Sequence, residues 1–300
     1  MAKLVECVPN FSEGRRPEVI EAIADEVRNV PNVRLLDVKA DASHNRVVVT
    51  FVGEPAAVKQ AAFNACKKAA ELIDMEKQHG EHPRIGATDV IPFIPVKNMT
   101  MEECVKLADE LAQEIAEKLE IPVYLYEEAA KNPARRALPE IRKGQYEGLK
   151  TEITKPERQP DYGPARMHPT AGATVVGARQ FLIAYNINLD TSDVHIAKKI
   201  ANCIREAKGG YKYVRAMGIS VQVGGRDVAQ VTINMVNYSG TPLFRVFETV
   251  KSEAARYGVN IIGSEIIGLT PMQALLDVAE FYLRLDGFDR KQVLEDNLSC

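Results

Sequence analysis

The same order of secondary-structure elements is predicted twice along this chain of 300 residues. Each half is expected to run strand, helix, strand, strand, helix, strand, because β-rich segments alternate with segments of helical periodicity. The halves share this order without a visible repeat of sequence. The pattern predicts an α/β protein (an α+β sandwich) with two successive β-α-β-β-α-β, ferredoxin-like subdomains, each a sheet covered by helices.

Apolar patterning and proline mark the elements of the first half. Strands are predicted at residues 4–8, 33–38, 46–52 and 90–96. The prolines within the last of these segments indicate an edge strand or an extended segment. Pro17 and Pro55 each suit the first turn of a helix, and an apolar face follows each of them.

The first half also carries extra elements. Thr100 and Glu103 are spaced as a capping box and predict a long helix, and residues 122–126 predict a further strand. Residues 144–164 are polar and rich in charge, proline and glycine, which predicts an irregular connector of the kind that is often functional.

A boundary near Gly177 is expected to separate an N-terminal subdomain of residues 1–178 from a C-terminal subdomain of residues 179–300. Strands of the second half are predicted at residues 180–187, 219–223, 228–236 and 259–267. Thr270 and Gln273 have the spacing of a capping box, which predicts a helix after the last strand.

Composition argues against several classes of function. The net charge of −3 and the pI near 6.0 give no sign of a nucleic-acid or membrane partner. No apolar run approaches the roughly 20 residues that cross a bilayer, and the N-terminus does not resemble a signal peptide. The cysteines are far apart, which predicts neither a zinc site nor a disulfide framework; they are Cys7, Cys66, Cys104, Cys203 and Cys300. We therefore expect a cytoplasmic protein.

The densest group of reactive side chains lies at residues 78–89, between a predicted helix and a predicted strand. It contains two imidazoles, His79 and His82, with two carboxylates and a guanidinium. Such surroundings can tune a histidine for general acid–base catalysis. A solvated polar turn explains the composition equally well. The two histidines could also share a metal ion, although Gly80 and Pro83 interrupt any metal-binding helix.

A second polar segment, residues 41–46, leads into a strong predicted strand. His44 and Arg46 are candidates for contacts with an anion because they stand at the mouth of that strand. A hairpin turn accounts for the neighbouring Ser43 and Asn45 on structural grounds alone.

A third segment, residues 163–174, joins the connector to the second subdomain. Its glycine, proline and alanine residues would let a flat ligand approach the backbone, and Arg166 and His168 could donate hydrogen bonds to a carboxylate or a pterin ring. An ordinary interdomain hinge would have the same composition. Asn10 lies in the loop expected after the first strand, where α/β proteins often bind ligands. The chain has no phosphate-loop motif and no Rossmann fingerprint.

Together these segments resemble the glutamate formiminotransferase family along the whole chain. The resemblance rests on residues 7–15, 41–46 and 163–172 and on the run His82-Pro83-Arg84-Ile85-Gly86-Ala87, in the expected order. It implies two α/β subdomains flanking a ligand cleft, usually in a homodimer. The chain resembles the stand-alone transferase, without a fused helical cyclodeaminase domain.

The family's reaction transfers a formimino group from N-formimino-L-glutamate to N5 of tetrahydrofolate during histidine degradation. The resemblance implies that His82 is the catalytic residue and that tetrahydrofolate is the co-substrate, and we expect no metal. The family's folate-binding segment corresponds to Gly163, Pro164, Ala165, Arg166, Met167, His168, Pro169, Thr170, Ala171 and Gly172. The other candidate binding residues are Asn10, His44, Arg46 and Arg84.

The implied reaction calls for one proton shuttle and several anion contacts. Tetrahydrofolate N5 must lose a proton as it attacks the formimino carbon, and the glutamate nitrogen must gain one as it leaves. An imidazole of near-neutral pKa at His82 could do both. Arg46, Arg84 and Arg166 are the candidates for the substrate carboxylates, because a guanidinium can bind a carboxylate through two parallel hydrogen bonds.

Three other functions are compatible with the residues. Formyl transfer between N-formylglutamate and tetrahydrofolate would use the same residue types. A non-catalytic folate-binding protein could share the fold, although it would have no need of His82. A metal-dependent hydrolase could use His79 and His82 together.

Overall fold

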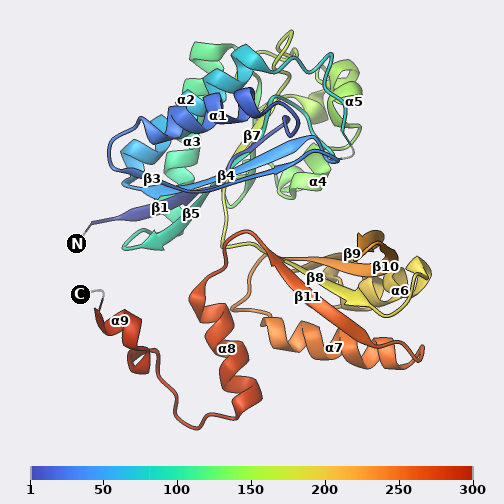
Figure 1. Cartoon of the computed structure of the whole chain (residues 1–300). Coiled ribbons are helices and arrows are strands. Elements are labelled where there is room, and N and C mark those ends of the chain that lie inside the picture. The colour runs from blue at the N-terminus through green and yellow to red at the C-terminus, as the bar shows by residue number, and fades with distance from the viewer. Residues whose placement is uncertain (1, 81, 299–300) are drawn as a thin grey trace. The chain divides into compact units, whose positions relative to one another are not determined.

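Two separate sheets organise the chain, one in Met1–Arg179 and one in Gln180–Cys300 (Figure 1). The computed structural model describes residues 2–80 and 82–298. Helices pack against each sheet, so the predicted α/β fold with two sheet-and-helix subdomains is confirmed. Cys300 and the Glu81 of the predicted polar cluster lie outside the described residues.

The first unit forms the predicted β-α-β-β-α-β arrangement. Its first five strands are β1 (Leu4–Cys7), β2 (Asn10–Phe11), β3 (Val33–Asp41), β4 (Arg46–Gly53) and β5 (Thr88–Lys97). β1 and β2 both lie between β4 and β5 and are antiparallel to both, while β3 pairs with the other side of β4. Helices α1 (Pro17–Arg28) and α2 (Pro55–Leu72) make the connections, and each begins at the predicted proline.

The predicted edge strand at residues 90–96 is instead an interior strand, because β5 also pairs with β7 (Thr174–Ala178). Its prolines are tolerated where the neighbouring strands are irregular. Pro95 lies at a shift in register between β1 and β5. Pro92 faces the break between β1 and β2, where its carbonyl accepts from the amide of Val8 at 3.4 Å.

Strand β7 was missed in the sequence, and Gly177, near which a boundary was expected, lies within it. β7 runs parallel to both of its neighbours, β5 and β6 (Val123–Glu127), and completes a seven-stranded sheet in the part of the chain that the structure describes. Gly177 has to be small, because a Cβ there would lie 2.4 Å from the ring of Tyr126. A short strand containing glycine gives little β signal.

Three helices cover one face of this sheet: α1, α2 and α3 (Met101–Leu119). The apolar face predicted after Pro17 is confirmed, since the residues of α1 that form it are all buried: Val19, Ile20, Ile23, Ala24 and Val27. The capping box of Thr100 and Glu103 is also confirmed. The apolar face predicted after Pro55 is also buried in α2, except that Leu72 at the end of the helix is 37% exposed.

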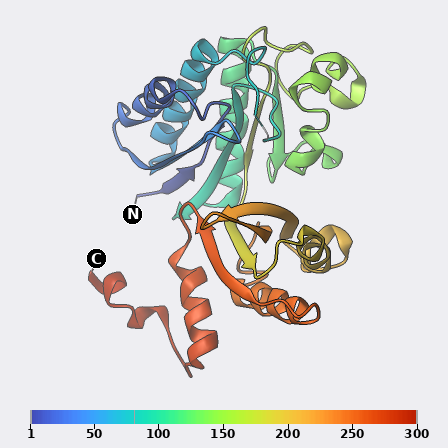
Figure 2. The ribbon, with the colours of Figure 1, turned by 45° about the vertical axis from the view of Figure 1, so that its right-hand side comes forward.

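The predicted irregular connector is wrong for most of its length. It contains α5 (Gln145–Glu152) and a short 3-10 helix at Pro156–Arg158, and α4 (Leu138–Ile141) precedes it after a 3-10 turn at Pro133–Arg135. Helices α4 and α5 cover the sheet face opposite α1 to α3 (Figures 1 and 2), where Ile141 of α4 and Leu149 of α5 are buried in a second cluster with residues of β5, β6 and β7. Charge, proline and glycine concealed this helical spacing.

The second unit repeats the arrangement with four strands in the order β11-β8-β10-β9. The strands are β8 (Ile183–Leu189), β9 (Val214–Val223), β10 (Arg226–Met235) and β11 (Ile261–Ile267). Helices α6 (Val194–Ile204) and α7 (Leu243–Ala255) bury their apolar residues against them. Gly224 and Gly225 form the turn between β9 and β10 with positive φ angles of 59° and 79°.

The chain then continues through α8 (Met272–Leu283), a 3-10 turn at Arg290–Gln292 and α9 (Leu294–Leu298). The capping box predicted at Thr270 and Gln273 is wrong, because Pro271 occupies the N-cap and no side chain caps the helix. Among the helices of the described residues, none is both long and apolar enough to span a bilayer.

Candidate active site

The turn at residues 41–46 and the segment at residues 78–89 are held together around His82. A Cβ on Gly80 would lie 2.3 Å from the carbonyl oxygen of His44, so the two backbones touch. Asn45 joins them, because its side chain donates to the carbonyl of His79 at 2.9 Å and accepts from the amide of Gly14 at 2.9 Å. Its φ of 48° is a conformation that asparagine adopts readily. Asn45 thus holds Gly14, the turn at residues 41–46 and the segment at residues 78–89 together.

His82 lies directly against Arg46. The Nη1 of Arg46 is 2.6 Å from the Nε2 of His82, and because a guanidinium can only donate, Nε2 is the acceptor. Burial is the largest cause that lowers the pKa of His82, and together with the nearby Arg46, Arg142 and His44 it brings that pKa to about 3. The imidazole is therefore neutral here, and the near-neutral pKa expected from the sequence is wrong for this arrangement of side chains.

The buried imidazole should make the folded protein sensitive to acid. The pKa of His82 falls from 6.5 to about 3 on folding, so the unfolded chain binds more protons between these values. The stability that His82 contributes is present above pH 6.5 and is lost progressively as the pH falls toward 3. We expect the difference in unfolding free energy between wild type and His82→Gln to change by roughly 1 kcal/mol per pH unit in this window. Denaturant titrations of both proteins between about pH 7 and 5 check this, and parallel pH dependences would contradict it.

A second arginine, Arg142, enters the site from the end of α4. It forms an ion pair with Asp89, and the two side chains are 14% and 2% exposed. Asp89 also accepts from the amide of Ile85 at 3.0 Å, which ties the pair to the segment that carries His82. Arg142 lies near enough to lower the pKa of Arg46, for which burial is the larger cause. No sequence motif points to Arg142, because it lies between two short helices, α4 and α5, whose packing depends on tertiary contacts.

Arg84 uses all five of its donors within the protein. Its Nε and Nη2 donate to the side chain and backbone carbonyl of Gln78, and its Nη1 donates to Gln145. Both Nη atoms also bind the carboxylate of Glu147, at 2.9 and 2.7 Å. These bonds fasten α5 to the His82 segment, so Arg84 has no donor left for a substrate carboxylate in this arrangement.

The end of the segment at residues 163–172 lies against Gly86. Gly86 and Gly172 form a β-bridge, and a Cβ on Gly86 would meet the carbonyl oxygens of Ala173 and Ala171 at 2.0 and 2.6 Å. His168 shapes the turn, since its Nδ1 accepts from the amide of Ala171 at 3.0 Å. The structure thus brings this end of the predicted folate segment to the His82 motif.

Other predicted residues occupy more peripheral positions. Arg166 is exposed and lies 3.8 Å from the carboxylate of Glu120, at the end of α3. Asn10, expected in a loop, belongs to β2, and its side chain donates to the carbonyl of Val8 at 2.9 Å. The N-terminal segment reaches the His82 motif instead through Ser12, whose hydroxyl donates to the carbonyl of Gly86 at 2.7 Å.

Neither metal ligation nor disulfide bonding is indicated for the described residues. No cluster of three or more His, Cys, Asp or Glu side chains suited to a metal occurs in residues 2–80 and 82–298. Cys7, Cys66 and Cys104 are free and buried, and Cys203 is free and exposed. Burial raises the pKa of the Cys7 thiol well above its usual value, so it is a poor nucleophile.

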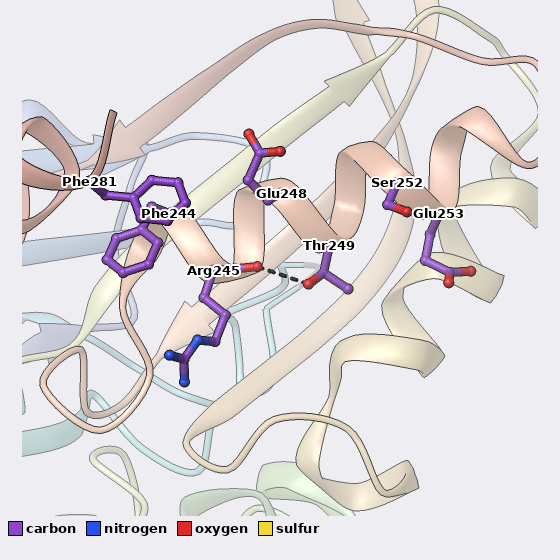
Figure 3. A pocket seen from close by; sticks show the side chains of 7 residues that line it. All are labelled: Phe244, Arg245, Glu248, Thr249, Ser252, Glu253 and Phe281. Atoms are coloured by element: carbon purple, nitrogen blue, oxygen red, sulfur yellow. Dashed lines mark hydrogen bonds between the residues drawn. The ribbon is translucent and has the colours of Figure 1, made fainter. Parts of the chain in front are cut away.

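The second unit has a shallow surface hollow of its own (Figure 3). It is lined by Phe244, Arg245, Glu248, Thr249, Ser252, Glu253 and Phe281. All but Phe281 come from one side of α7, and the rings of Phe244 and Phe281 stack with centroids 4.2 Å apart. None of the predicted site residues lines this hollow, so the candidate site rests on the buried polar cluster of the first unit.

The two units correspond to two family models. Residues 4–179 match the N-terminal subdomain of the formiminotransferase domain, and residues 184–297 match the formiminotransferase domain. The fold is therefore that of a formiminotransferase domain. The chain belongs to this family, as the sequence motifs indicated.

Full-length relatives define the group within that family. Glutamate formimidoyltransferase from Streptococcus pyogenes serotype M1 is 52% identical over 99% of both chains. Glutamate formimidoyltransferase from Thermoplasma acidophilum is 49% identical over 97% of this chain and 96% of its own. Formimidoyltransferase-cyclodeaminase from Gallus gallus is 49% identical over 95% of this chain but only 53% of its own. The chain thus matches glutamate formimidoyltransferases from end to end.

Proposed function

We propose that this protein transfers the formimino group of N-formimino-L-glutamate to N5 of tetrahydrofolate, giving 5-formiminotetrahydrofolate and L-glutamate. The observation that carries the proposal is a neutral His82, with Nε2 as acceptor, beside Arg46. Relatives named glutamate formimidoyltransferase match the chain over nearly its whole length and support the assignment.

The neutral imidazole suits the first step. Tetrahydrofolate N5 attacks the formimino carbon and forms the new N–C bond, and His82 takes the proton that N5 loses. Arg46 has to release Nε2 for this, and a substrate carboxylate would draw its guanidinium away. The same carboxylate would offset the positive charge that keeps the pKa of His82 low.

The second step returns that proton. The imidazolium formed beside Arg46 and Arg142 is acidic, so it protonates the glutamate nitrogen readily as the old C–N bond breaks. Glutamate leaves as a neutral amine and His82 returns to its starting form. Proton transfer of this kind is typically worth about 10²–10⁴ in rate, and the remainder of the acceleration comes from holding both substrates in register.

Other predicted residues would bind the substrates. The segment from Gly163 to Gly172 would hold the folate, since its last residue lies against the His82 motif. The exposed Arg166 suits the flexible glutamate tail of the folate. We also propose that the protein acts in the cytoplasm as a homodimer, as the family resemblance implies. The free cysteines among the described residues support a reducing compartment.

The direct test is a donor comparison with one preparation of the protein. Tetrahydrofolate is incubated with N-formimino-L-glutamate or with N-formyl-L-glutamate, and the folate product and free glutamate are measured by mass spectrometry. We expect turnover with the formimino donor and activity that survives exhaustive chelation. Turnover with the formyl donor alone would replace the proposed substrate, and folate binding without turnover of either donor would indicate a non-catalytic protein.

Arg84 should affect turnover more than binding. Arg84→Lys keeps the charge but loses the fork that joins Gln78, Gln145 and Glu147, so the His82 segment should loosen. We expect kcat to fall by about tenfold or more, with both KM values changed by less than about threefold. Steady-state kinetics with each substrate varied in turn would check this. A selective rise in one KM would instead show that Arg84 binds that substrate.

A further inference from the structure

We propose that Arg142 and Arg46 together bind one carboxylate of the glutamate portion of the formimino donor. This inference rests on the proposed function and assigns a second guanidinium to the same site. Arg142 was not among the residues that the sequence singled out, and it reaches the site from α4, far along the chain from His82.

Hydrogen bonds within the protein hold the side chain of Arg142 in place. Its Nη2 binds Asp89, whose other carboxylate oxygen accepts from the amide of Ile85, three residues after His82. Asp89 is almost fully buried and belongs to the central strand β5, so this anchor is rigid. A carboxylate-binding arginine held in this way is pre-organised and loses little freedom when the ligand arrives.

The positive charges around His82 favour the binding of an anion. Arg142 uses one bond to Asp89, and its Nε is buried without a hydrogen-bond partner in the described part of the chain. Among the described residues, Arg46 forms no ion pair with a carboxylate, and it donates a hydrogen bond only to the neutral His82. Among the described residues, the other carboxylate that acts on Arg46 is Asp41, which is paired with His44 at 2.8 Å.

Both guanidiniums are partly buried, yet among the described residues only that of Arg142 is paired with a buried carboxylate, Asp89. The two positive charges repel each other, since the charge of Arg142 helps to lower the pKa of Arg46. An excess of positive charge away from water is energetically costly unless a bound anion neutralises it. A substrate carboxylate at this point would bind both arginines, release Arg46 from His82 and bring the donor to the imidazole.

The test separates the two substrates and uses a matched control. We expect Arg142→Gln to raise KM for N-formimino-L-glutamate by roughly 10- to 100-fold, the loss typical of a charge-assisted contact, with KM for tetrahydrofolate within about twofold. Its affinity for L-glutamate, measured by calorimetry, should fall by the same factor. Arg135→Gln removes the other buried Arg–Asp pair of the first unit, with Asp161, and should lower the melting temperature without moving either KM.

Each result decides the proposal. If Arg142→Gln folds and binds L-glutamate as wild type does, or if both KM values rise equally, the inference is wrong. If Arg142→Gln fails to fold, Arg142→Lys keeps the charge beside Asp89 but loses the planar guanidinium, so its KM for the donor should still rise, and an unchanged KM would overturn the inference as well. A wild type that binds L-glutamate through Arg142 but transfers no formimino group would overturn the proposed function alone.

Discussion

Replacing His82 with alanine is expected to lower kcat by about 10² or more while leaving the affinity for tetrahydrofolate nearly intact. The substitution removes the imidazole whose Nε2 is in contact with Arg46. It also removes the group that would carry a proton from the attacking nitrogen to the leaving one. Binding should survive, because the backbone that joins this motif to the segment ending at Gly172 is not altered.

The measurements are kcat with both substrates saturating and the dissociation constant of tetrahydrofolate by calorimetry. His79→Ala is the matched control, since that side chain is exposed in the same segment, and within the described residues the hydrogen bond of His79 to Asn45 uses its backbone carbonyl and not its imidazole. It should retain full activity. Wild-type kcat in His82→Ala would end the assignment of His82 as the proton shuttle.

Replacing Gly86 with alanine is expected to lower the free energy of unfolding by about 3 kcal/mol or more. The added Cβ would lie 2.0 Å from the carbonyl oxygen of Ala173 and 2.6 Å from that of Ala171. Both are backbone atoms next to β7, so no side-chain rotation relieves the overlap. The β-bridge between Gly86 and Gly172 would have to open, and activity should fall with it because the bridge joins the His82 motif to the predicted folate segment.

Gly148→Ala provides the contrasting substitution. Gly148 lies inside α5, and a Cβ there would have nothing within 4 Å. Alanine should stabilise the helix by about 0.5–1 kcal/mol. Equilibrium denaturation of both variants gives the comparison, and equal stabilities would show that the close approach at Gly86 can relax without cost.

The repeated order of elements, and with it the fold class, could be predicted because local signals agreed with the final packing. In α1, a proline at the first turn and an apolar stripe indicated the same helix that the sheet buries. In α3, the capping box marked the first turn. Errors arose where tertiary contacts outweighed local preference. Pro92 and Pro95 indicated an edge, yet interruptions in the neighbouring strands let β5 lie inside the sheet.

The candidate site was only partly predictable for the same reason. His82, Arg46 and the turn around Asn45 were found because they lie in compact polar runs of sequence. Arg142 was not found, since its proximity to His82 depends on α4 and on its pairing with Asp89. Arg84 was found, but its bonds to Gln145 and Glu147 depend on α5, so its binding partners could not be read from the motif.

The parallel insertion of β7 between β5 and β6 has a consequence for biosynthesis. Until residues 174–178 have left the ribosome, β5 and β6 cannot be joined, and each keeps an unpaired edge that invites association with other chains. The nascent first unit is therefore vulnerable to aggregation until its last strand is made. The loop ending at Gly172 comes directly before that strand, so it is anchored on both sides only when the strand docks, and the active centre should be among the last regions of the unit to mature.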